Sequence, residues 1–272
     1  MLTLIFGILV GLALGLTGGG GSIFAIPLLI VGLNIPPQEA ITISLAAVTM
    51  VALVGTISAF KSNLIEYRSG SIFAIAGLIT APAGVLLANQ LDDRLILTSF
   101  SLLVVVVAVS MWRKAGQSPE NAAVVRANFS TANETSAAIC RFDPDNKSLR
   151  LTAPCSLALA FTGTITGILS GLFGVGGGFI IVPALMLITQ LSIQRAVATS
   201  LFVIAFIGLS GIAAALISER QIDPSITALF LAGGVIGMLT GRKIANRIAG
   251  SQLQKTFAVM LLVVAAVTLI TA

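Results

Sequence analysis

The chain has 272 residues, of which 57% are hydrophobic and 9% are charged, and its mean hydropathy is +1.07. A soluble domain carries about 25% charged residues, so this composition excludes a water-soluble globular protein. It predicts membrane spans of about 20 apolar residues each. The net charge of +5 then reports on loop orientation and not on nucleic-acid binding.

The apolar segments form two groups of four on either side of a polar stretch. That stretch, from Arg113 to Arg150, holds six basic and four acidic residues with many Ser, Thr and Asn. We interpret it as a solvent-exposed linker with room for a short helix. Its Cys140 and the nearby Cys155 match no metal or redox motif, and we expect free thiols. The apolar segments are 2–33, 39–60, 70–91, 95–112, 155–188, 195–217, 225–241 and 253–271.

An internal repeat relates the two groups. At an offset of 156 residues, glycine, proline and leucine recur at matching positions; one extra residue then shifts the offset to 157. We therefore expect a first transmembrane repeat at 1–112, a polar linker at 113–152 and a second transmembrane repeat at 153–272. The matches include Gly11 with Gly167, Gly15 with Gly171, Gly18 with Gly174, Pro27 with Pro183, Ser44 with Ser200, Gly77 with Gly234 and Asn89 with Asn246.

Segments 2–33 and 155–188 are too long for one span and too short for two. Glycines interrupt both, at 18–21 and at 174–178. A glycine inside a helix costs about 1 kcal/mol relative to alanine, so several together end the helix. Non-helical backbone at membrane depth must be covered by protein or line a wet cavity. Each segment is therefore either one interrupted crossing or a hairpin that returns to its own side.

The positive-inside rule favours the hairpin. If both broken segments cross the membrane, the Lys and Arg residues divide nine to six. If both return, thirteen share one side and only Arg94 and Arg220 lie opposite. We therefore predict an all-α integral membrane protein of the inner cell membrane, with both termini outside and the linker in the cytoplasm. It has two inverted-topology repeats, each a glycine-broken re-entrant helical hairpin plus three transmembrane helices. Paired broken segments in inverted repeats indicate a transporter site near the midplane.

The two glycine blocks resemble the sulfite exporter TauE/SafE family of membrane transporters. The resemblance lies in residues 15–22 (GLTGGGGS) with Pro27, in residues 171–178 (GLFGVGGG) with Pro183, and in residues 196–201 (AVATSL). It covers both repeats and implies transport of sulfur-containing anions such as sulfite or sulfonates. Two departures between the halves bear on substrate choice: Ile43 stands where the second half has Thr199, and Thr17 where it has Phe173.

No Asp, Glu, Lys or Arg lies in the middle of an apolar segment, so neutral donors must hold an anion. Glycine turns offer convergent N–H groups, and the helix after each turn points its N-terminal dipole at the turn. The competing interpretations are that small residues only pack helices and that hydroxyls bond back to their own helix. We expect Glu39 and Arg195, at helix starts, to cap or anchor, and a gate or ion-coupling role for either is the alternative. The candidate substrate-binding residues are Thr17, Gly18, Gly20, Gly21, Ser22, Ser44, Gly174, Gly176, Gly177, Gly178, Thr199 and Ser200.

These observations favour a secondary transporter that exports small sulfur-containing anions, such as sulfite or organosulfonates. An anion channel is an alternative that the sequence does not separate from it. A membrane-embedded enzyme is a weaker one, because the chain has no histidine and no carboxylate at mid-depth for a base or a metal site. We expect no enzyme activity, cofactor, metal or nucleic-acid partner. The expected partners are the anion and membrane lipid, with a coupling ion and a homodimer left open.

Overall fold

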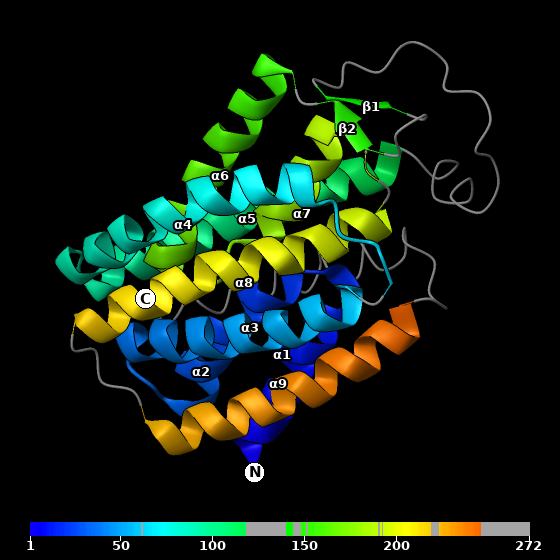
Figure 1. The fold of residues 1–272 in the computed structure, drawn as a ribbon. Coiled ribbons are helices and arrows are strands. Elements are labelled where there is room, and N and C mark those ends of the chain that lie inside the picture. The colour runs from blue at the N-terminus through cyan, green and yellow to red at the C-terminus, as the bar shows by residue number, and fades with distance from the viewer. Residues whose placement is uncertain are drawn as a thin grey trace.

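The computed structural model describes residues 1–60, 62–117, 140–143, 148–150, 152–189, 191, 193–218 and 223–245. Long helices lie side by side in one bundle (Figure 1). The expected segment 253–271 lies outside the described residues. In chain order the elements are α1 (Leu2–Thr17), the 3-10 helix η1 (Gly20–Phe24), α2 (Ala25–Leu33), α3 (Pro37–Phe60), α4 (Tyr67–Gln90), α5 (Asp93–Gln117), β1 (Arg141–Asp143), β2 (Ser148–Arg150), α6 (Ala153–Phe173), α7 (Gly178–Thr189), α8 (Ile193–Ile217) and α9 (Pro224–Ala245).

Among the described residues, five helices are long and apolar enough to cross a membrane: α3, α4, α6, α8 and α9. Their outer faces carry large apolar side chains that neither the bundle nor a polar rim covers. Ile79 is 68% exposed and Phe161 is likewise 68% exposed. Apolar surface on this scale requires a lipid environment. The prediction of an all-helical integral membrane protein is therefore confirmed, with only the short pair β1–β2 outside it among the described residues.

The first broken segment folds back on itself as a hairpin of α1, η1 and α2, called here the first hairpin. Gly21 lies against the backbone of α1 at Leu14, whereas Gly32, near the end of α2, lies against the ring of Phe6. The chain after the turn thus retraces α1 toward its start. A single interrupted crossing is excluded for this segment.

The second broken segment makes the same reversal with α6 and α7, called here the second hairpin. A disulfide joins Cys140 to Cys155 near the start of α6. The Cys140 N–H also donates to the carbonyl of Ile188, near the end of α7, at 3.0 Å. The start of α6 and the end of α7 therefore lie together. The expectation of two free thiols is wrong, because the linker brings two cysteines 15 residues apart into contact.

The described part of the linker contains strands and not the short helix for which we left room. β1 and β2 pair antiparallel, with Phe142 opposite Leu149. The first residues of the expected linker belong to α5, which runs to Gln117 and so extends beyond the boundary expected at residue 112. The polar stretch at 118–139 lies outside the described residues.

Each hairpin is attached to the bundle by a parallel helix from the other half of the chain. α1 runs beside α9, with Gly7 and Gly11 against the backbone of Phe230 and Gly234. α6 runs beside α4, with Gly163 and Gly171 against Phe73 and Ala81. Small residues allow this backbone-to-backbone approach in membrane helices. The packing role expected for these glycines is thus what the structure displays.

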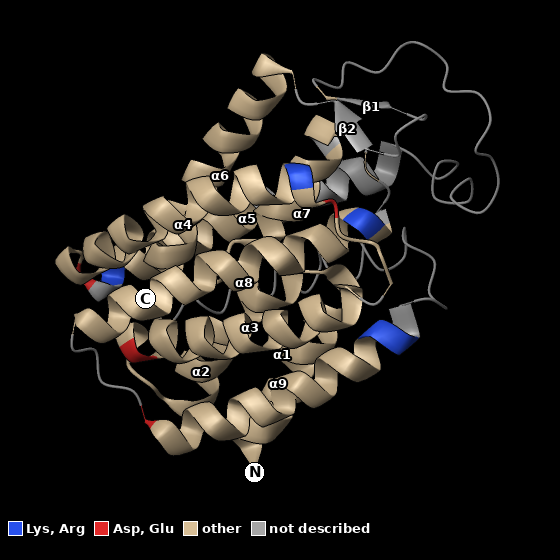
Figure 2. Ribbon diagram, in the orientation of Figure 1, with Lys and Arg blue, Asp and Glu red and all other residues tan. Residues whose placement is uncertain are grey.

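Charges collect at the two ends of the bundle (Figure 2). The starts of α4 and α8 and the end of α9 share one end, which carries Arg68, Arg195, Arg242 and Lys243 and is called here the basic face. The opposite end, the acidic face, carries Glu39, Asp92, Arg94 and Asp223. Glu39 lies in the first turn of α3, as expected. The Asp223 carboxylate accepts the N–H groups of Ser225 and Ile226 and so caps α9. Each hairpin therefore begins and ends at the same face of the bundle, the first at the acidic face and the second at the basic face.

Candidate functional site: two glycine turns that meet at mid-depth

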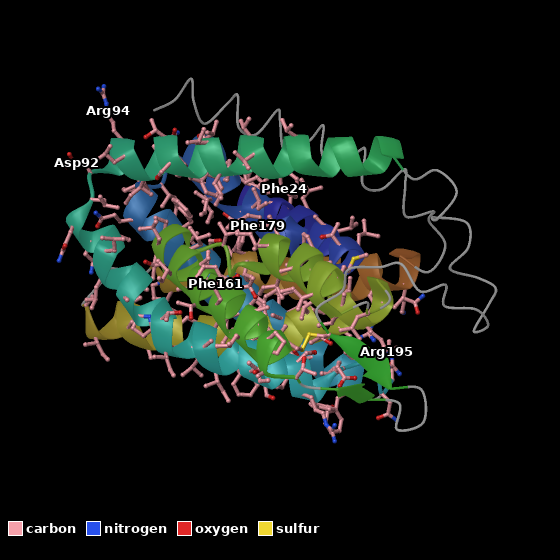
Figure 3. All side chains as sticks on the ribbon, turned by 90° about the horizontal axis from the view of Figure 1, so that it is seen from above. Phe24, Asp92, Arg94, Phe161, Phe179 and Arg195 are labelled. Atoms are coloured by element: carbon pink, nitrogen blue, oxygen red, sulfur yellow. A yellow bond between two sulfur atoms is a disulfide. The ribbon has the colours of Figure 1, made fainter. Side chains whose placement is uncertain are left out.

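The two glycine turns touch each other in the middle of the bundle. A Cβ atom on Gly178 would lie 2.5 Å from the Cα atom of Gly19. Gly176 in turn packs between Val48, at the middle of α3, and Ile204, at the middle of α8. Residues 18–27 and 170–179 are buried. The turns therefore form an occluded centre, with Phe24 and Phe179 placed between the charged ends (Figure 3).

Left-handed glycines make both turns. Gly18 ends α1 with φ 74°, and Gly174 ends α6 with φ 64°. The second turn has two more, Gly176 at 68° and Gly177 at 66°. Only glycine takes such values without cost. The helices end here because several residues in succession leave the right-handed region, as the glycine blocks predicted.

A serine from a neighbouring crossing helix holds each turn. The Ser44 hydroxyl on α3 donates to the carbonyl of Gly174 at 3.0 Å, and the Ser200 hydroxyl on α8 donates to the carbonyl of Gly18. Both hydroxyls are completely buried. The structure thus pairs Ser44 with Gly174 and Ser200 with Gly18, and the two serines are called here the serine clamps. In this conformation their hydroxyl protons are donated to carbonyls at helix ends and not to an anion.

Other predicted hydroxyls also donate to the backbone. Thr17 donates to the Ala13 carbonyl of its own helix, and Ser22 donates to the carbonyl of Gly19 at 2.6 Å. Thr199 points away from the turns and accepts the N–H of Glu66 at 3.0 Å. Gly20 and Gly21 lie in η1, Gly176 and Gly177 lie in the turn before α7, and Gly178 is the first residue of α7.

Comparison with known proteins agrees with this architecture. The sulfite exporter TauE/SafE family matches residues 3–268. The chain belongs to this family. A probable membrane transporter protein of Xylella fastidiosa (strain 9a5c) is 31% identical over 94% of this chain and 90% of its own. The probable membrane transporter protein YunE of Bacillus subtilis is 27% identical over 97% of this chain and 93% of its own. No solved structure matches.

Membership of the TauE/SafE family makes this protein a multi-pass membrane transporter and not an enzyme. The motifs quoted from both halves belong to that family, so the resemblance drawn from the sequence is confirmed. The family match spans both hairpins and the linker.

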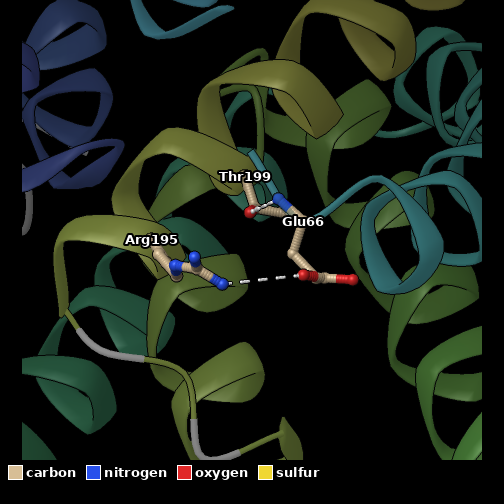
Figure 4. Close-up of polar contacts among 3 residues, drawn as sticks. All are labelled: Glu66, Arg195 and Thr199. Carbon is tan, nitrogen blue, oxygen red and sulfur yellow. Dashed lines mark hydrogen bonds and ion pairs between the residues drawn. The ribbon is translucent and has the colours of Figure 1, made fainter. Parts of the chain in front are cut away.

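An ion pair on the basic face of this TauE/SafE protein joins α8 to the start of α4 (Figure 4). Arg195 Nη1 lies 3.9 Å from Glu66 Oε2. Glu66 is 7% exposed, and its backbone N–H donates to Thr199 one turn further along α8. The predicted anchoring of Arg195 thus has a partner, Glu66, that the sequence did not suggest. Glu66 was overlooked because it lies outside the apolar segments.

Ser170 is a second residue that the sequence analysis missed. It lies in the last turn of α6, beside the second glycine turn, and is 1% exposed. Its repeat counterpart at the offset of 156 is Leu14. A serine at a position where the first repeat has leucine is a difference in the sequence that could have identified it.

Proposed function

We propose that this TauE/SafE protein is a secondary transporter that exports a small sulfur-containing anion, such as sulfite or an organosulfonate. The observation that carries the proposal is the contact of two uncharged glycine turns at the middle of the bundle. Turns of this kind present backbone N–H groups to an anion. Neutral donors suit transport, because the cargo must also be released.

Reciprocal contacts support an inverted repeat as the basis of alternating access. Gly18 packs on Val197 and Gly174 packs on Ile41, and these four residues pair at the offset of 156. The serine clamps pair in the same way. The starts of α3 and α8 also differ by 156 residues, and those of α4 and α9 by 157. One half can then rock against the other around the turns, as in other inverted-repeat transporters.

Flux measurements test the proposed substrate. Purified protein in liposomes should move sulfite or a small sulfonate by a saturable process, and excess unlabelled anion should compete. Saturation separates a transporter from a channel, whose flux stays proportional to concentration. The panel is sulfite, thiosulfate, methanesulfonate, sulfate and acetate, with empty liposomes as control. Transport of none of these anions would refute the proposal.

We further propose that the basic face lies in the cytoplasm of the cell, with the protein in the inner membrane. The positive-inside rule supports this orientation, because the hairpin topology predicted from the sequence assigns thirteen Lys and Arg residues to this side. The Cys140–Cys155 disulfide lies at the same end, where cytoplasmic thiols are normally kept reduced. Under this proposal the two cysteines are reduced in the cell, and the disulfide forms when the protein is oxidised.

Labelling of single cysteines tests the orientation. In a variant with Cys140 and Cys155 replaced by serine, we expect Ser62→Cys to react with maleimide only from the cytoplasm. Asn34→Cys should react only from outside. Ser62 follows α3 at the basic face and Asn34 follows α2 at the acidic face, and both are exposed. The reverse pattern would show that the disulfide, and not the charge count, reports the compartment.

A further inference from the structure

Ser170 has a buried hydroxyl that no described residue satisfies. It is 1% exposed, and its Oγ has no hydrogen-bond partner within the described part of the chain. Leaving a buried polar group unbonded costs about 1–3 kcal/mol, so such a group needs an explanation.

Ser170 departs from the usual bonding pattern of hydroxyls in these helices. They usually donate to the carbonyl four residues back, as Thr166 does to Thr162 and Thr49 does to Leu45. For Ser170 the corresponding acceptor is the carbonyl of Thr166, to which its Oγ does not donate. That carbonyl lies against the second glycine turn, 3.2 Å from where a Cβ atom on Gly177 would be.

The Ser170 hydroxyl therefore lies next to the start of α7. Its Cβ atom is 3.6 Å from the position of a Cβ on Gly177. α7 has 12 residues and begins at Gly178, so the N–H groups of Gly178 and Phe179 have no carbonyl within the helix to bond. The positive end of the helix dipole adds to them. The Ser170 side chain and these amides thus belong to the same buried turn.

The first turn lacks this arrangement. The counterpart of Ser170 there is Leu14, and Gly21 packs directly on the Leu14 backbone. The N–H and the hydroxyl of Ser22 both donate to the carbonyl of Gly19. The first turn thus bonds its serine hydroxyl, whereas the Ser170 hydroxyl of the second has no partner among the described residues.

We infer that Ser170 and the N-terminus of α7 form the oxyanion site, and that this site selects a singly charged anion such as a sulfonate or hydrogen sulfite. The inference rests on the proposed transport function and adds the residue, the hairpin and the charge of the substrate. All its donors are neutral, and the described Lys and Arg residues lie near the ends of the helices or in β1 and β2 (Figure 2). A second negative charge would be buried with no cation to balance it, which is costly.

The site can be tested by titrating the purified protein with methanesulfonate and with sulfate. Binding is measured as the rise in unfolding temperature that each anion causes. We expect methanesulfonate to bind at least tenfold more tightly than sulfate. Ser170→Ala should raise the Kd for methanesulfonate about tenfold or more. The same variant should leave the unfolding temperature of the ligand-free protein unchanged or higher, because it removes an unbonded polar group.

Ser69→Ala is the matched control. Ser69 is the other buried hydroxyl without a partner among the described residues, and it lies at the basic end of α4. Its variant should bind methanesulfonate as the wild type does. Normal binding by Ser170→Ala would overturn the inference and leave the transport proposal standing, and equal affinity for sulfate would overturn the charge selection. A wild type that binds and moves none of the anions would overturn both.

Discussion

Replacing Gly178 with alanine should reduce transport more than tenfold. The added Cβ would lie 2.5 Å from the Cα atom and 3.0 Å from the carbonyl oxygen of Gly19. Both are backbone atoms, so no side-chain rotation can relieve the contact. The two hairpins must separate, and overpacking of this kind costs about 1–3 kcal/mol. Transport into liposomes and the unfolding temperature of the same preparation measure the two effects.

Gly55→Ala is the control for this experiment. Gly55 lies inside α3, and a Cβ there would meet Cε of Met238, the far end of a flexible side chain. Both substitutions gain the same helix propensity, but only the one at Gly178 forces backbones apart. Wild-type transport and stability in Gly178→Ala would show that the turns do not touch in the working protein.

The glycine pattern and the charges predicted the hairpins because each reports one strong physical effect. Residues 18–21 and 174–178 cannot continue a helix, and the loop cations respond to membrane orientation. The predicted segments 39–60 and 195–217 differ from α3 and α8 by two residues at their starts and end where they do. Helix positions in a membrane follow from composition, since few other structures satisfy the backbone there.

Side-chain partners could not be predicted in the same way. Lipid and protein interior are both apolar, so the hydropathy of a span does not indicate which face packs on protein. Ser44 finds its acceptor 130 residues away, at Gly174, and nothing local in the sequence marks that pair. The disulfide was not predicted for a related reason. The strands β1 and β2 lie between its two cysteines, and the polar composition of these strands indicated only a linker.

The two glycine turns are less alike than the sequence prediction assumed. Twelve residues were proposed from two matching turns, on the assumption that both halves contribute alike. The structure shows that the halves share clamps, Ser44 and Ser200, yet differ in unused donors. The two hairpins thus match in their serine clamps and differ at Ser170, which stands where the first half has Leu14.

Replacing both clamps, in a Ser44→Ala and Ser200→Ala double variant, should have the second large effect. Each single variant leaves a buried carbonyl at the end of a helix without its donor, which costs about 1–3 kcal/mol. Because Gly174 and Gly18 occupy matching places in the two halves, the single variants should lower the unfolding temperature by similar amounts.

The double variant reveals whether the clamps act together. The two turns touch at Gly19 and Gly178, so releasing one hairpin already loosens the other, and the second loss should be smaller than the first. Transport should fall below that of either single variant, since neither hairpin is then held at mid-depth. Thr56→Val is the control, because its hydroxyl donates to Ala52 of its own helix and holds no turn. Strictly additive losses would mean that each hairpin is positioned independently, and unequal single variants would mean that only one turn depends on its serine.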